Sequence, residues 1–259
     1  MTLLAVHGLC KAFGGVVAAK NIDFALQAGE LLALIGPNGA GKSTTFNMVG
    51  GQLRPDRGSV LLGGEDVTRL PPAEKFRRGV GRTFQVAQTF PSMTVAENVQ
   101  MALIGRADQT RALKPRARSL HRERALEILS SVGMGEAADR ACSTLAYGDV
   151  KRVELAIALA GAPKLLLMDE PTAGMAARER AALMELTARI ARERRIGVLF
   201  TEHDMSAVFT HADRILVLVR GEVIAAGAPD AVRADARVRQ AYLGESGAAL
   251  AEAARRGRA

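Results

Sequence analysis

A glycine-rich stretch near the N-terminus combines residue types that bind phosphate, at the spacing that binding requires. Residues 36–43 read Gly-Pro-Asn-Gly-Ala-Gly-Lys-Ser and match the pattern G-x-x-x-x-G-K-[ST], between a predicted strand at 31–35 and a predicted helix beginning near Lys42. Glycines let the backbone curl until its N–H groups face a phosphate, and the helix N-terminus adds a favourable dipole. We expect Lys42 to reach the β- and γ-phosphates of a nucleotide and the Ser43 hydroxyl to ligate Mg²⁺. The predicted nucleotide-binding residues of this loop are Gly36, Pro37, Asn38, Gly39, Ala40, Gly41, Lys42, Ser43 and Thr44.

Two acids that end a buried apolar run form the second chemical signal. Asp169 and Glu170 follow Leu-Leu-Leu-Met at 165–168, a run typical of a central parallel strand. Acids at the end of a buried strand need a cation or a catalytic task. Asp169 suits a water-mediated contact with Mg²⁺, and Glu170 suits a general base that polarises the attacking water. Taken alone, the pair also fits an exposed acidic turn; the phosphate loop favours the catalytic interpretation.

One histidine lies where a third catalytic group is expected. His203 follows another apolar strand, predicted at 196–201, with one residue between them. A lone histidine is usually structural, but at the end of a core strand this one is predicted to reach the edge of the γ-phosphate. The other histidines are predicted to be structural or to face solvent.

The elements that position these groups predict an α/β fold: a phosphate-loop NTPase core with a mixed or parallel sheet, an N-terminal antiparallel β subdomain and an inserted helical subdomain. Strand-like alternation early in the chain indicates the antiparallel part, and helical spacing from about 91 to 145 indicates the insert. Further along, strands alternate with helices in β-α-β fashion. Strands are predicted at 4–6, 22–26, 31–35, 59–62, 164–169, 196–201 and 214–219, and helices at about 149–159 and 177–195. We expect one domain over 1–246, with the core and antiparallel part in 1–90 and 163–246, the helical and signature subdomain in 91–162, and a flexible tail at 247–259.

Composition narrows the classes of function. The 259 residues carry a net charge of +8, which fits a nucleic-acid partner, an anionic membrane surface or simply solvated helix faces; the spread of Arg at helical spacing favours the last. With no Trp and 4% aromatic residues, surfaces for stacking single-stranded nucleic acid are scarce. Two cysteines fit a reducing compartment. We find no signal peptide and no apolar run of about 18 residues, so a membrane role is expected to come through a partner.

Five motifs in a fixed order resemble the nucleotide-binding subunits of ATP-binding cassette (ABC) transporters, from residue 3 to about residue 244. Besides the phosphate loop and the two acids, they include a glutamine loop at 82–85, a signature region at 145–149 and a switch segment at 201–204. The resemblance implies that Gln85 touches Mg²⁺ and senses a membrane partner, and that His203 is the switch histidine. It also implies an adenine contact from Phe13 and, across a dimer, nucleotide contacts from Ala146, Tyr147, Gly148 and Asp149.

A narrower likeness is to the branched-chain, or hydrophobic, amino acid importer group. Its cues are the sequences at 82–85, 93–98, 173–175 and 241–244. Members also move urea, short amides and aromatic acids. The resemblance implies an ATPase that uses ATP and Mg²⁺ as a peripheral protein on the cytoplasmic face of the bacterial inner membrane. Its expected partners are transmembrane permease subunits, a second cassette subunit that is identical or a sister chain, and indirectly a solute-binding protein.

Three positions depart from the usual family pattern. Ala146 replaces a Ser that bonds the γ-phosphate across the dimer, Asp149 replaces a Gln, and Ala176 replaces an Asn or Asp in the loop after the second acid. These changes leave open a regulatory subunit that holds ATP but hydrolyses it weakly. A second alternative is a cassette ATPase that acts on nucleic acid or the ribosome, although no nucleic-acid partner is expected.

Overall fold

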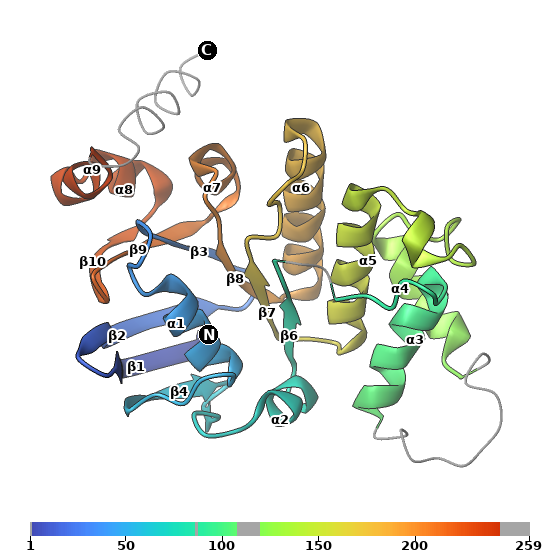
Figure 1. Ribbon diagram of the computed structural model, residues 1–259, viewed down its shortest axis with the longest axis horizontal. Helices are drawn as coiled ribbons and strands as arrows, with labels where there is room; N and C mark the ends of the chain where they lie inside the picture. Colours follow the sequence, from blue (N-terminus) through green and yellow to red (C-terminus); the bar gives the residue numbers. More distant parts are fainter. Residues whose placement is uncertain (1, 86–87, 108–119, 244–259) are drawn as a thin grey trace.

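Two β-sheets and a group of helices build the fold (Figure 1) of the computed structural model, which describes residues 2–85, 88–107 and 120–243. The tail predicted at 247–259 lies outside the described residues, and so does most of residues 111–124, a segment rich in Arg and Lys. Within the described residues, no helix combines the length and the apolar character needed to cross a membrane.

The larger sheet is mixed: β10 runs antiparallel to β9, and its other neighbouring strands are parallel. The smaller sheet is antiparallel throughout its pairings. The α/β class and its antiparallel part are therefore confirmed. In spatial order the larger sheet contains β10 (Glu222–Gly227), β9 (Arg214–Val219), β3 (Leu31–Ile35), β8 (Gly197–Thr201), β7 (Leu165–Asp169) and β6 (Val80–Thr83), and the smaller β2 (Val16–Gln27), β1 (Thr2–Phe13), β4 (Arg57–Leu62) and β5 (Glu65–Asp66).

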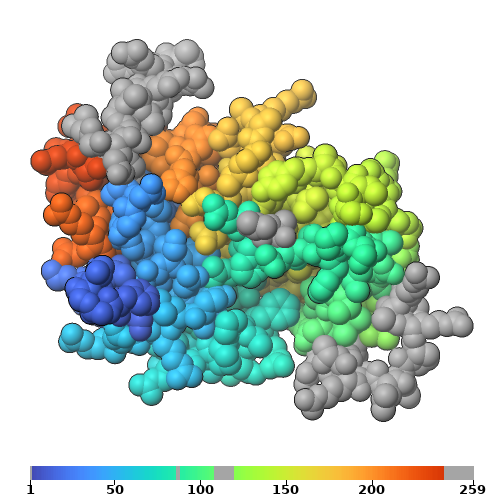
Figure 2. Space-filling model, viewed as in Figure 1, coloured from blue at the N-terminus to red at the C-terminus, as the bar shows by residue number. Residues whose placement is uncertain are grey.

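The helices lie on both sides of the larger sheet. Helices α3, α4 and α5 gather on the side of the molecule away from the smaller sheet (Figure 1), and Figure 2 shows the same separation between the green to yellow-green helices and the blue N-terminal strands. The helices are α1 (Lys42–Gly50), α2 (Pro72–Arg77), α3 (Val95–Arg106), α4 (Arg122–Ser131), α5 (Tyr147–Ala160), α6 (Ala177–Arg194), α7 (Met205–His211), α8 (Pro229–Ala234) and α9 (Ala236–Leu243), with a short 3-10 turn at Cys142–Thr144.

Several predicted boundaries were wrong. The strands predicted at 4–6 and 22–26 are the middles of the longer strands β1 and β2, which stay paired through several register shifts that interrupt the apolar alternation. The helix predicted from about Asp149 begins two residues earlier, at Tyr147. Its N-cap, Ala146, has no side-chain oxygen to mark the start, so the first-turn acid was the more visible signal.

Strand side chains of the larger sheet alternate between two buried clusters. Leu32 and Leu34 of β3 pack toward the smaller sheet and α1, whereas Leu31, Ala33 and Ile35 pack toward α5 and α6. Successive side chains of a strand point to opposite faces, and here both faces are covered. This explains why the central strands are continuously apolar rather than alternating.

The parallel order β3-β8-β7-β6 places the carboxyl ends of four strands at one edge of the sheet. The phosphate loop follows β3, and residues 84–85 follow β6. Glu170 follows β7, and residues 202–204 follow β8. The predicted catalytic groups therefore leave the sheet side by side.

A buried lysine closes the far end of the helix that follows the phosphate loop. The side chain of Lys75 in α2 is fully buried, and its Nζ donates to the carbonyl oxygens of Val49 at 2.8 Å and Met48 at 3.3 Å, in the last turn of α1. A cation suits the carbonyl end of a helix. Desolvation nevertheless lowers the pKa of Lys75 to about 8.

That lowered pKa predicts a stability signature. Because the pKa of about 8 in the folded state lies below the usual 10.5, the unfolded chain binds more protons through this window, so the free energy of unfolding should rise with pH there. In a Lys75→Met variant this rise is lost. Urea unfolding should therefore show the stability of the parent, relative to Lys75→Met, increasing by about 2 kcal/mol from about pH 7.5 to about pH 10. The exposed Lys164, changed to Met, is the matched control; the same pH dependence in both variants would contradict the assignment.

Candidate active site

The phosphate loop is built around two close backbone contacts that require glycine. A Cβ atom at Gly36 would lie 2.2 Å from the carbonyl oxygen of Leu218 in β9, and one at Gly41 would lie 2.1 Å from that of Ala18 in β2. Gly41 also adopts a φ of 99° as the N-cap of α1, a left-handed conformation that favours glycine. The shape of the loop is therefore set by the adjacent strands as well as by the loop's own sequence.

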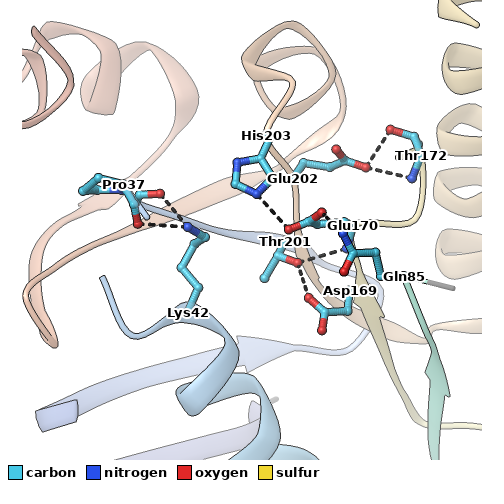
Figure 3. Close-up of polar contacts among 10 residues, drawn as sticks. Pro37, Lys42, Gln85, Asp169, Glu170, Thr172, Thr201, Glu202 and His203 are labelled. Atoms are coloured by element: carbon cyan, nitrogen blue, oxygen red, sulfur yellow. Dashed lines mark hydrogen bonds and ion pairs between the residues drawn. The ribbon is translucent and has the colours of Figure 1, made fainter. Parts of the chain in front are cut away.

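Lys42 lies folded over that loop (Figure 3). Its Nζ donates to the carbonyl oxygens of Gly36 at 2.7 Å and Pro37 at 3.1 Å, and the side chain is largely buried. Ser43, the next residue, is exposed. The loop thus holds an ammonium group and a hydroxyl at the N-terminus of α1, where an anion is favoured. Among the other predicted loop residues Asn38 and Gly39 are exposed, Pro37 and Thr44 are half-buried, and Ala40 is buried.

Three predicted catalytic side chains meet at the ends of β6, β7 and β8 (Figure 3). Glu170 accepts a hydrogen bond from Gln85 Nε2 at its Oε2, and its Oε1 lies 2.8 Å from His203 Nε2. The bond to Gln85 is also 2.8 Å long. Two neighbouring strands therefore fix both oxygens of one carboxylate, and each oxygen keeps a further lone pair for another donor.

Thr201, at the end of β8, joins the two acids. Its Oγ1 donates to Asp169 Oδ1 at 2.8 Å, and the same oxygen accepts the backbone N–H of Glu170 at 3.0 Å. Glu170 has a φ of 46°, a left-handed conformation that is uncommon for a non-glycine residue. Strained backbone of this kind persists where surrounding contacts enforce it and is concentrated at functional sites. Thr201 supplies part of that enforcement.

Two residues to which the sequence analysis assigned no role stabilise the site through hydrogen bonds. The buried Glu202 accepts the backbone N–H of Thr172 at 2.9 Å and its hydroxyl at 2.7 Å, which ties the segment after Glu170 to the segment that carries His203. Glu202 adjoins the predicted histidine in the sequence, but nothing in the sequence pairs it with Thr172.

Arg82, in β6, is the second. It lies between the rings of Phe46 and Phe84, about 5 Å from each centroid, and donates to Asn47 Oδ1 at 2.8 Å. Its Nη2 also lies 3.7 Å from Asp169 Oδ2. Arginine over an aromatic face is a favourable contact. Arg82 thereby connects α1, the glutamine loop and the first acid.

The remaining predicted contact residues make none of the hydrogen bonds described above. Phe13 is half-exposed, and Lys11 Nζ lies 5.7 Å from the centroid of its ring. The signature region forms the start of α5, which Figure 1 shows separated from α1 by the larger sheet. There Ala146 is the N-cap without a side-chain capping bond, Tyr147 is 46% exposed, and Asp149 lies in the first turn beside Gly148.

The oxygen donors at the site suit a magnesium ion. The Ser43 hydroxyl, the Gln85 amide oxygen and the Asp169 carboxylate are hard ligands of the kind that Mg²⁺ takes alongside substrate phosphates. The ammonium of Lys42 and the N-terminus of α1 suit the phosphates themselves. Together with Glu170, the predicted base, this arrangement has the groups that attack of water on a phosphoryl group requires.

The chain matches two family models. One, described as ABC transporter, matches residues 19–173, more than half of the chain. The other, described as Branched-chain amino acid ATP-binding cassette transporter, matches residues 222–248.

Curated relatives match along nearly the whole chain. The high-affinity branched-chain amino acid transport ATP-binding protein LivG of Escherichia coli K12 is 39% identical over 252 residues, covering 94% of this chain and 98% of LivG. The lipopolysaccharide export system ATP-binding protein LptB of Haemophilus influenzae is 35% identical over 245 residues, covering 95% of this chain and 98% of LptB.

Solved structures agree with the fold. A nucleotide-free ATP-binding cassette from an ABC transporter superposes with a TM-score of 0.85 at 30% identity, covering 95% of this chain and all of that one. A dimeric, post-hydrolysis cassette bound to ADP and phosphate gives a TM-score of 0.74 at 27% identity, covering 88% of this chain and 99% of that one. By its sequence, its fold and the arrangement of its phosphate loop and acids, the chain belongs to the ABC transporter family as one of its ATP-hydrolysing cassettes.

Proposed function

We propose that this chain energises an importer for branched-chain amino acids or related small solutes, as the ATPase beneath separate transmembrane permease subunits. The convergence of Gln85 and His203 on Glu170 is the observation that supports hydrolysis at this site. The match of residues 222–248 to the branched-chain family model and the likeness to LivG support the class of cargo. The same proposal places the chain as a peripheral protein on the cytoplasmic face of the bacterial inner membrane. It also implies an indirect partnership with a solute-binding protein.

In the proposed cycle two cassettes, identical or sister chains, close head to tail over two ATP molecules. Lys42 and Ser43 of one copy hold the phosphates, and the backbone N–H of Gly148 with the start of α5 from the other copy completes the site. The separation of α5 from α1 supports this pairing, because one chain does not cover its own phosphate loop with its own signature region (Figure 1). The dimeric cassette with ADP and phosphate supports it independently.

At each closed site Glu170 accepts a proton from the attacking water. Gln85 and His203 hold the two carboxylate oxygens, so the base is oriented before the water arrives. Ser43, Gln85 and Asp169 would hold Mg²⁺, which supplies neutralisation of the charge on the phosphates when bound. Loss of the phosphate contacts after hydrolysis lets the copies part, and residues near Gln85 pass that movement to the permease.

Transport is the direct test of the proposal. With the co-purifying membrane chains in liposomes and the matching solute-binding protein outside, ATP enclosed within should drive uptake of labelled leucine, isoleucine or valine. Uptake of only an amide, urea or an aromatic acid would keep the chain in the same importer group but change the assigned cargo. A membrane partner that extracts lipid instead of importing solute would contradict the importer assignment.

The role of Glu170 predicts a trapped state. Glu170→Gln keeps the size and shape of the side chain but removes the base, so kcat should fall by about 10²- to 10⁴-fold while ATP still binds. Phosphate release measures the rate, and size-exclusion chromatography with ATP and Mg²⁺ should show the variant retained as a dimer. The exposed Glu193 on α6, changed to Gln, serves as the matched control. Hydrolysis at the parent rate in Glu170→Gln would show that the base is another group.

The uncapped start of α5 predicts a gain from Ala146→Ser. A serine hydroxyl at the N-cap accepts a backbone N–H of the first turn and should raise the free energy of unfolding by about 1 kcal/mol. The same hydroxyl donates to the partner copy's γ-phosphate, so ATP-dependent dimerisation of Glu170→Gln should tighten about fivefold.

A second uncapped helix provides the comparison. Ala228 is the N-cap of α8 and likewise has no side-chain capping bond. Ala228→Ser should stabilise the fold without changing dimerisation, as urea unfolding and analytical ultracentrifugation would show. Equal dimerisation of the Ala146→Ser and Ala228→Ser proteins would remove Ala146 from the nucleotide contact.

A further inference from the structure

Helix α5 carries a buried ion pair that the proposed mechanism does not use. Lys151 and Glu154, three residues apart, are 2% and 4% exposed, and Lys151 Nζ lies 3.1 Å from Glu154 Oε2. Burial raises the pKa of Glu154, as expected for a carboxylate removed from water. A buried pair of charges contributes little to stability by itself and needs further hydrogen bonds to offset its desolvation.

Three such bonds join the start of the glutamine loop to α5. Lys151 Nζ donates to the carbonyl oxygens of Phe84 at 2.8 Å and Gln85 at 2.9 Å. Glu154 Oε1 accepts the backbone N–H of Phe84 at 2.6 Å. Three charge-assisted bonds therefore fasten the backbone of residues 84–85 to one turn of α5, and such bonds are stronger than neutral ones.

The loop held in this way reaches the proposed base directly. Gln85 Nε2 donates to Glu170 Oε2 at 2.8 Å, so a displacement of α5 is carried through residues 84–85 to the carboxylate. At its other end the ion pair meets the signature region. Lys151 Nζ lies 5.8 Å from the centroid of the Tyr147 ring, in the first turn of α5. A continuous set of contacts thus runs from the start of α5 to Glu170.

We propose that Lys151 and Glu154 are positioning residues that set the place of Gln85 against Glu170 and make it follow the movement of α5. In the head-to-tail pair, the start of α5 meets the partner copy's nucleotide, so the ion pair connects that nucleotide with the base at the chain's own site. This inference rests on the proposed roles of Gln85 and Glu170 and extends them to a pair of residues outside the site.

The test replaces the pair by apolar side chains of similar length. Lys151→Met with Glu154→Leu removes all three backbone bonds without leaving an unpaired buried charge, so the fold should survive. For the full chain, kcat should fall about 10- to 100-fold while the affinity for ATP, titrated with a fluorescent ATP analogue, stays within about twofold, because the phosphate loop is untouched. Lys151→Arg retains a cation and donors and should recover most of the rate.

A distant ion pair provides the matched control. Arg214 Nε donates to Glu30 Oε1 at 2.8 Å, and this pair likewise joins segments far apart in the chain. Glu30→Leu with Arg214→Met should alter the urea midpoint but not kcat. If the Lys151/Glu154 double variant does not fold, the milder Glu154→Gln should still lower kcat by about threefold at unchanged ATP affinity; a parent rate there overturns the proposal.

A double-mutant cycle with Gln85→Ala separates positioning from general stability. If Lys151 and Glu154 act through Gln85, replacing them in the Gln85→Ala variant should lower kcat little further. A parent rate in the folded pair variant, or effects that multiply fully with those of Gln85→Ala, would overturn the positioning role. A parent rate in Gln85→Ala alone would instead overturn the role of Gln85 on which the inference rests.

Discussion

The parallel alignment of β3, β8, β7 and β6 is the constraint on which the site depends. Each strand ends at the same edge, so a loop that binds phosphate, two acids, a histidine and a glutamine become neighbours although they are far apart in the chain. The sheet can hold them there because both of its faces are buried, one under the smaller sheet and α1 and the other under α5 and α6. Ligand sites at the carboxyl ends of parallel strands are a general result of this arrangement.

Sequence reasoning succeeded where the signal is local. The phosphate loop and the run before Asp169 each occupy a few consecutive residues, and the class of fold follows from the order of such local patterns along the chain; the structure and the family matches agree with that class. It missed Glu202 with Thr172, and Lys151 with Phe84, because each pair joins separate segments and no single segment shows that its charge is buried. The start of α5 was misplaced because Ala146 lacks a capping side chain. What each site residue does in catalysis stays a prediction.

One of the family cues has a local physical basis. The segment 93–98 contains Thr94 and Glu97, whose side chains and backbone N–H groups bond each other reciprocally at the start of α3. Asn98 then bonds the backbone of Phe90 in both directions, through Oδ1 at 2.7 Å and Nδ2 at 3.2 Å. These contacts fix how the chain enters the helical side of the molecule. A sequence signature used to recognise a subgroup thus corresponds to a helix-entry structure.

The separation of α1 from the start of α5 also has a genetic consequence when two unlike cassettes pair. Each chain would then contribute the phosphate loop of one nucleotide site and the covering helix of the other. A substitution of a signature residue at the start of α5, such as Gly148, would leave its own chain's phosphate loop intact and impair hydrolysis at the site that contains the companion chain's phosphate loop. Genetic complementation between damaged sister chains would therefore depend on which nucleotide site is damaged and not on which polypeptide carries the damage. A weak signature region could persist as long as the opposite nucleotide site alone sustains turnover.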